Sequence, residues 1–155
     1  MNLPTSATWL LAINVAATWY MVGLIWMVQV VHYKMFDRVG DDEFARYALD
    51  HARLITPIVA LPMLVELTSA AALCWITPPG MSRELLIVGF GLVILIWLST
   101  ALLQVPAHER LAKGFDVVVY QRLVSTNWIR TVAWTIRGVM LFFLIVSWLN
   151  QLIRN

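Results

Sequence analysis

Four apolar stretches constrain the fold of this chain more than any other feature of its sequence. They run over residues 7–31, 54–76, 85–105 and 129–149. A helix needs about 20 mostly apolar residues to cross the hydrocarbon core of a bilayer. Backbone polar groups must find partners within the segment there, which favours helices. We therefore expect an all-α membrane protein, an antiparallel four-transmembrane-helix bundle in which residues 1–155 form a single membrane domain.

Composition supports the same class of protein. Hydrophobic residues make up 61% of the chain and charged residues only 13%, whereas soluble domains are about half apolar and about a quarter charged. The single cysteine, Cys74, excludes a disulfide within the chain and a cysteine metal site. The expected partner is the lipid bilayer, and no nucleic-acid partner is expected.

The three links between the apolar stretches differ in length. TPPGMS is short, so the second and third helices should form a hairpin. The longer links, DRVGDDEFARYALDHARL and PAHERLAKGFDVVVYQRLVSTN, are typical of amphipathic helices. Asp41, Asp42 and Glu43 suit the first turn of one such helix, where the helix dipole favours negative charge. Gly114 is a candidate end of another helix, and Asp116 a candidate cap of the next.

The distribution of basic residues predicts the orientation. Cytoplasmic loops of membrane proteins carry an excess of lysine and arginine. The two longer links and their flanks hold Lys34, Arg38, Arg46, Arg53, Arg110, Lys113, Arg122 and Arg130, against Arg83 and Arg154 on the opposite side. We expect the longer links to be cytosolic and both termini to be outside, in the inner (cytoplasmic) membrane of a bacterium.

Two charged residues fall inside apolar stretches. Glu66 lies in the second and Arg137 in the fourth, at similar distances from the predicted cytosolic side. A charge at the bilayer centre costs about 2.5–3.5 kcal/mol on insertion scales. A buried Glu66–Arg137 ion pair would relieve part of that cost. Either a structural brace or a functional pair is consistent with the sequence.

The fourth stretch carries a polar stripe. Asn127, Arg130, Trp134 and Arg137 follow steps of three, four and three residues, which places them on one helix face. That face should point into the bundle. Arg130 lies near the predicted cytosolic end, and extension of its head to the lipid headgroups is an equal alternative.

All three histidines are expected at the cytosolic end of the bundle. Several polar residues should lie at the same level and complete a candidate site. The candidate cofactor-binding residues are His32, His51, His108, Gln29, Gln104, Asn127 and Arg130. Imidazoles on facing helices can bind a metal ion or haem iron. The same side chains also suit an anionic or quinone-like ligand, or act only as anchors at the membrane interface.

The chain resembles a group of small four-helix bacterial membrane proteins of unknown function. HYKMFDRVG, HARLITPIVALPMLVE, LLQVPAHERLAKGF and LVSTNWIRTVAW carry the resemblance, which covers nearly the whole chain. More distantly, the layout is similar to that of the bacterial membrane protoporphyrinogen oxidase family. That likeness implies haem and porphyrinogen oxidation. The family carries a histidine early in its first helix, where this chain has Asn14 as its nearest polar residue, and no residue role is carried over.

Three functions are consistent with these features. The first is a small redox protein that binds a cofactor, a metal ion at His32, His51 and His108, or a lipophilic small molecule. The cofactor is unknown, with haem or a metal as candidates. The second is a non-catalytic accessory subunit of a larger membrane complex. The third is a transporter or channel, which would require a homo-oligomer.

Overall fold

The computed structural model describes residues 6–154, which are helical apart from short links and contain no strand in that range. Within this range, four helical segments are long and apolar enough to cross a membrane. They are Ser6–Arg38, Asp41–Trp75, Arg83–Leu111 and Val117–Gln151. The chain is therefore a multi-pass membrane protein, and its helices extend beyond the boundaries predicted from hydropathy.

Each of the four segments is helical throughout, either as one α-helix or with a change of helix type along its length. The elements are α1 (Ser6–Met27), η1 (Val28–His32), η2 (Tyr33–Arg38), α2 (Asp41–Trp75), α3 (Arg83–Ser99), η3 (Thr100–Gln104), α4 (Val105–Leu111) and α5 (Val117–Arg154). α1, η1 and η2 together make the first segment, and α3, η3 and α4 the third. α2 begins at Asp41, so the helix predicted in the first long link and the second apolar stretch form one continuous helix.

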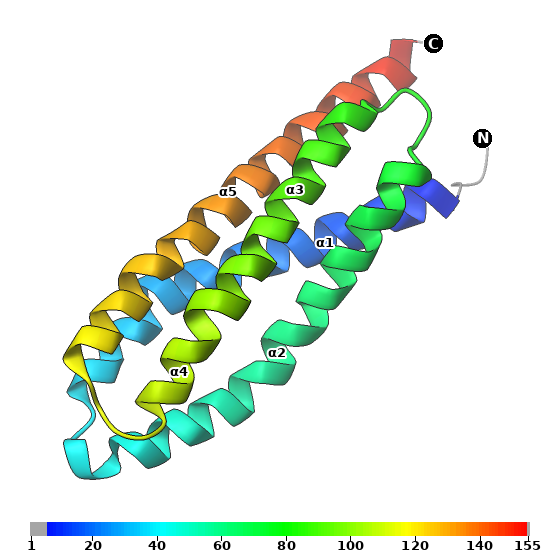
Figure 1. Ribbon diagram of the computed structural model, residues 1–155. Coiled ribbons are helices and arrows are strands. Elements are labelled where there is room, and N and C mark those ends of the chain that lie inside the picture. Colours follow the sequence, from blue (N-terminus) through cyan, green and yellow to red (C-terminus); the bar gives the residue numbers. More distant parts are fainter. Residues whose placement is uncertain (1–5, 155) are drawn as a thin grey trace.

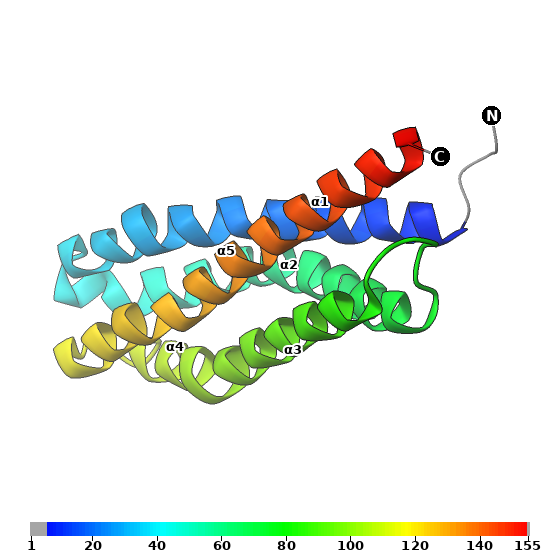
Figure 2. The ribbon, with the colours of Figure 1, turned by 90° about the horizontal axis from the view of Figure 1, so that it is seen from above.

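The links divide between the two ends of the bundle. In Figure 1, the start of α1, the 76–82 link and the end of α5 lie at one end. The 39–40 and 112–116 links lie at the other, which we call the histidine end because η1, the first part of α2 and α4, which carry His32, His51 and His108, lie there. α1 contacts α2 and α5, and α3 contacts the same two helices. The four segments thus enclose a common interior (Figure 2).

Local sequence accounts for several helix ends. The first turn of α2 is acidic, as expected for a helix N-terminus. Asp116 Oδ1 accepts hydrogen bonds from the backbone of Val118 at 2.9 Å and of Val119 at 3.1 Å, which confirms the predicted cap of α5. Gly114, with a φ of 143°, provides the turn after α4 that an L side chain rarely adopts.

Two turns of π-helix interrupt the regular hydrogen bonding near the histidine end. In η1 the Tyr33 amide donates to the Val28 carbonyl, and in η3 the Val105 amide donates to the Thr100 carbonyl. Pro106, which has no amide hydrogen, lies two residues after the end of η3 and explains the loss of regular bonding there. Such turns rotate the following residues relative to a continuous α-helix and are frequent at functional sites.

The interior has an apolar part at each end and polar groups between them. One buried apolar cluster, centred on residues such as Ile25, Phe36 and Leu123, lies toward the histidine end. A second, which includes Leu11, Leu73 and Leu141, lies toward the opposite end. Large apolar side chains such as Leu61 cover the outside of the helices, as expected for surfaces in contact with lipid.

Candidate functional site

Two clusters of polar side chains lie inside the bundle, and they differ in how many of their polar atoms form hydrogen bonds. The first surrounds Glu66, in the middle of α2. The second lies around a cavity nearer the histidine end.

Glu66 is 1% exposed, and both of its carboxylate oxygens accept hydrogen bonds. Arg137 Nε donates to Oε1 at 2.9 Å, so the structure brings together the two charged residues that the sequence singled out. Thr18 Oγ1 also donates to Oε1, at 2.7 Å. Trp134 Nε1 donates to Oε2 at 2.8 Å. The carboxylate therefore joins α1, α2 and α5.

Asn14 completes this network, and its side chain forms three hydrogen bonds. Its side-chain amide donates to the Glu66 carbonyl at 3.1 Å and to Ser69 Oγ at 2.9 Å. Its oxygen accepts from Arg137 Nη2 at 2.8 Å. Gly89 on α3 leaves the space that the arginine head occupies, since a Cβ there would lie 2.7 Å from Arg137 Nη1. The network is bonded throughout, which favours a structural brace.

The three histidines meet at the histidine end in two hydrogen-bonded pairs. His32 Nε2 lies 2.9 Å from His51 Nδ1, and the Tyr33 hydroxyl lies 3.1 Å from His108 Nε2. The ring centroids of His51 and His108 are 5.6 Å apart, and Phe36 packs edge-on against all three histidine rings. Consecutive residues on the first segment, His32 and Tyr33, thus each hold a histidine of another segment.

The predicted amide residues have separate roles. Asn127 Nδ2 donates to Gln29 Oε1 at 2.7 Å, and Gln29 Nε2 donates to the Val124 carbonyl at 3.1 Å. This pair joins the first segment to α5, and neither residue lines the cavity described below. Gln104, by contrast, does line it, while bonded to Ser99 Oγ at 3.0 Å and Thr126 Oγ1 at 3.2 Å.

A cavity of about 240 Å³ lies between the four segments, next to the histidines. Most of its wall is apolar, with a few polar groups gathered on the histidine side. The lining residues that can form hydrogen bonds through their side chains are Tyr33, His51, Thr56, Trp97, Thr100, Gln104, His108 and Arg130. Thr56 on α2 and Val105 on α4 are the exposed members of the lining. These two residues place the opening of the cavity between α2 and α4.

Two donors in the cavity wall have no acceptor. Arg130 Nε and Trp97 Nε1 are buried and make no hydrogen bond to any residue in the described range 6–154. Arg130 is 6% exposed, so the alternative in which its head reaches the lipid headgroups is wrong. Its guanidinium instead lies over the Trp134 ring, 5.2 Å from the ring centroid. Buried donors without partners are rare in native proteins, and here two belong to one cavity.

The histidines do not fit a metal site in this arrangement. The facing nitrogens of His32 and His51 bond to each other, and His108 Nε2 bonds to Tyr33. Within residues 6–154, no group of three or more histidine, cysteine, aspartate or glutamate side chains is placed to hold a metal ion. The cavity, at about 240 Å³, is also smaller than the ~300–1,000 Å³ usual for pockets that enclose drug-sized ligands.

The structure thus divides the predicted site residues into two sets. His51, His108, Gln104 and Arg130 line the cavity, whereas His32, Gln29 and Asn127 support it from outside. Tyr33, Thr18 and Trp97 were not among the site residues predicted from the sequence. Thr18 follows Asn14 by four residues, a spacing that indicates a shared helix face. For Trp97 only its depth in the third stretch gave a signal.

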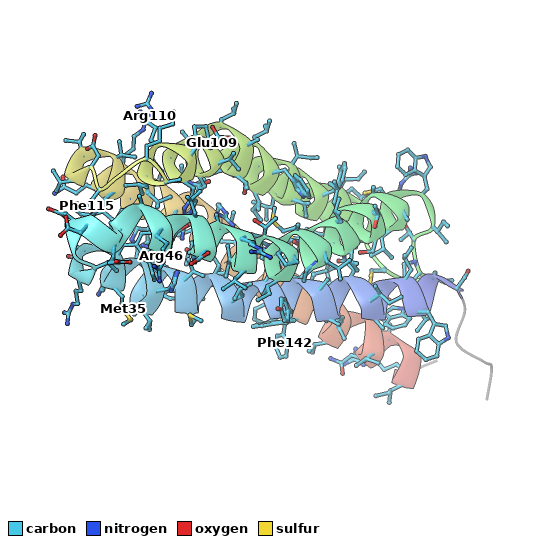
Figure 3. All side chains as sticks on the ribbon, turned by 90° about the horizontal axis from the view of Figure 1, so that it is seen from below. Met35, Arg46, Glu109, Arg110, Phe115 and Phe142 are labelled. Atoms are coloured by element: carbon cyan, nitrogen blue, oxygen red, sulfur yellow. The ribbon has the colours of Figure 1, made fainter. Side chains whose placement is uncertain are left out.

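The outer surface at this end is charged. Arg46, Glu109 and Arg110 lie near the histidine end in Figure 3, and Arg110 points away from the bundle. Arg46 and Glu43 form an ion pair at 3.7 Å, with both side chains mostly exposed.

No family model, no curated protein and no solved structure matches this chain.

Proposed function

We propose that this protein binds a lipophilic small molecule in the cavity between its four segments. The observation that carries the proposal is the pair of buried donors, Arg130 Nε and Trp97 Nε1, in the wall of one cavity. A ligand oxygen that accepted hydrogen bonds from these groups would offset their desolvation cost. The mostly apolar wall and the mouth between α2 and α4 favour a ligand that partitions into the bilayer.

The proposal includes the topology and location of the site. The bundle is antiparallel, its longer links are amphipathic and cytosolic, and both termini are outside. The excess of lysine and arginine in those links supports this orientation. The protein would reside in the inner membrane of a bacterium, and its ligand would enter from the cytosolic leaflet.

A redox role for the bound molecule is a second candidate, which the histidine pairs favour. His51 lines the cavity and is bonded to His32, which is only partly buried. An imidazole can accept a proton on one ring nitrogen and release one from the other, so this pair would connect a quinone-like ligand with the membrane surface. Extraction of the bound molecule and comparison of its ultraviolet spectrum before and after borohydride treatment tests this candidate. An unchanged spectrum would exclude it.

Native mass spectrometry of the protein, released from membranes in mild detergent, tests ligand binding. We expect a bound small molecule in the unaltered protein and a loss of most of it in Thr56→Trp and Ala60→Trp, because an indole at either position occupies the mouth or the cavity. Leu61→Trp is the matched control, since Leu61 is 66% exposed on the outer face of α2. It should retain the ligand.

Equal occupancy in all four proteins, or none in the unaltered protein, would contradict the proposal. Thr56 is exposed, so Thr56→Trp is not expected to disturb folding. A thermal unfolding curve for each variant separates loss of ligand from loss of structure.

A further inference from the structure

The charge balance of the cavity identifies the chemical class of its ligand. Arg130 makes no ion pair with any residue in the part of the chain that the structure describes. Arg137, seven residues further along α5, provides an internal comparison. Its guanidinium is paired with Glu66 and bonded to Asn14. The two arginines are both buried, and only one has an anionic partner.

The cavity wall cannot supply the missing anion. Its lining, as far as the structure describes it, contains no aspartate or glutamate. The stacking of Arg130 on Trp134 stabilises a cation but does not neutralise it. A buried charge without a counter-ion is strongly unfavourable, so an anion is the ligand that this wall accommodates best.

Size and shape limit the anion further. A cavity of about 240 Å³ is smaller than the ~300–1,000 Å³ usual for sites that enclose drug-sized ligands. It has room for a polar head and the first part of a chain. The remainder would leave between Thr56 and Val105, where exposed lining residues mark the mouth, and continue into the bilayer. This geometry suits an amphiphile with one chain.

The unpartnered donors match a head with two acceptor oxygens. A carboxylate bonds to a guanidinium through two parallel N–H···O bonds, and its remaining lone pairs can accept from an indole N–H. A phosphate would carry more charge than Arg130 neutralises, and more acceptor oxygens than the two unpartnered donors can bind. A neutral quinone or alcohol would leave Arg130 without a counter-ion.

We propose that the ligand is a single-chain amphiphilic carboxylate, with Arg130 as its counter-ion and Trp97 Nε1 as a second donor. This inference rests on the proposed function, because it names the class of molecule that the cavity binds. Trp134 contacts both Arg130 and Glu66. Its ring packs against the guanidinium of Arg130, and its Nε1 donates to the Glu66 carboxylate.

Direct binding measurements with three twelve-carbon probes test the inference. Bound lipid is first removed from the purified protein. Dodecanoate, dodecanol and dodecyl phosphate are then each titrated against this protein in a neutral detergent. Hydrogen bonds to charged groups predict that dodecanoate binds about 10- to 100-fold more tightly than dodecanol. Arg130→Gln should abolish this preference, and Arg130→Lys should retain part of it. Dodecyl phosphate should bind less tightly than dodecanoate.

The outcomes separate the class of ligand from the existence of the site. Equal binding of dodecanoate and dodecanol, an unchanged preference in both Arg130 variants, or tighter binding of dodecyl phosphate would overturn the carboxylate inference. If Thr56→Trp still reduced binding in those cases, the proposed function would stand. No binding of any probe, together with no effect of Thr56→Trp, would overturn both. If Arg130→Gln does not fold, Arg130→Lys replaces it in the test, because lysine keeps the charge and should still lower the preference for dodecanoate.

Discussion

Replacement of Glu66 by leucine is expected to lower the free energy of unfolding by about 3–5 kcal/mol. Leucine is similar in size and apolar, but it leaves the buried Arg137 with only Asn14 as an acceptor. It also removes the acceptor of Thr18 and of the Trp134 indole. Removal of one partner from a buried pair costs more than the pair contributes, because the other charge stays buried. Equilibrium unfolding in mixed micelles measures the change.

Two controls define what this result means. Glu43, on the same helix, pairs with Arg46 across 3.7 Å at an exposed position, so Glu43→Gln should change stability by less than about 1 kcal/mol. The double variant Glu66→Leu with Arg137→Leu should be more stable than Glu66→Leu alone, since neither charge is then left unpaired. A Glu66→Leu protein as stable as the unaltered one would show that the network does not brace the bundle.

Replacement of Trp134 by alanine is expected to cost a similar amount, about 3–5 kcal/mol. Trp134 is among the largest fully buried side chains, and its loss leaves a cavity next to a carboxylate oxygen without its donor. It also removes the ring on which Arg130 lies. The effect should therefore reach both polar groups of the interior, and ligand binding should weaken together with stability.

Phenylalanine at this position separates the two contributions. Trp134→Phe keeps most of the volume but loses the hydrogen bond to Glu66, for an expected cost of about 1–3 kcal/mol. Trp75→Ala is the control for a tryptophan in contact with the surroundings, since it is 77% exposed, and should change stability by about 0.5 kcal/mol or less. If Trp134→Ala behaved like Trp75→Ala, Trp134 would not link the two sites.

Hydropathy and helical spacing predicted much of this architecture. Four spans follow from the length of the apolar stretches, and the structure has four helical segments of sufficient length and apolarity within its described range. The burial of Arg130, Trp134 and Arg137 agrees with the stripe that their spacing predicts, because α5 is one regular helix over these residues.

The site itself was harder to predict, because contacts between helices depend on their rotation. Gln29 and His32 lie within or at the end of the π-helical turn η1, where a regular helical spacing does not apply. Gln29 therefore bonds to Asn127 and Val124 rather than to the cavity. The cavity and its unpartnered donors arise only when all four segments are placed, and no motif in the sequence encodes them.

The most direct test of whether the cavity holds a lipophilic ligand is photolabelling with a long-chain probe that carries a diazirine next to its polar head. Peptide mapping after illumination gives the labelled residues. We expect labels on Val59, Ala60 and Val105 around the mouth, and their loss in Thr56→Trp. Labels confined to outward-facing residues such as Leu61 and Leu64, and unchanged in Thr56→Trp, would contradict it.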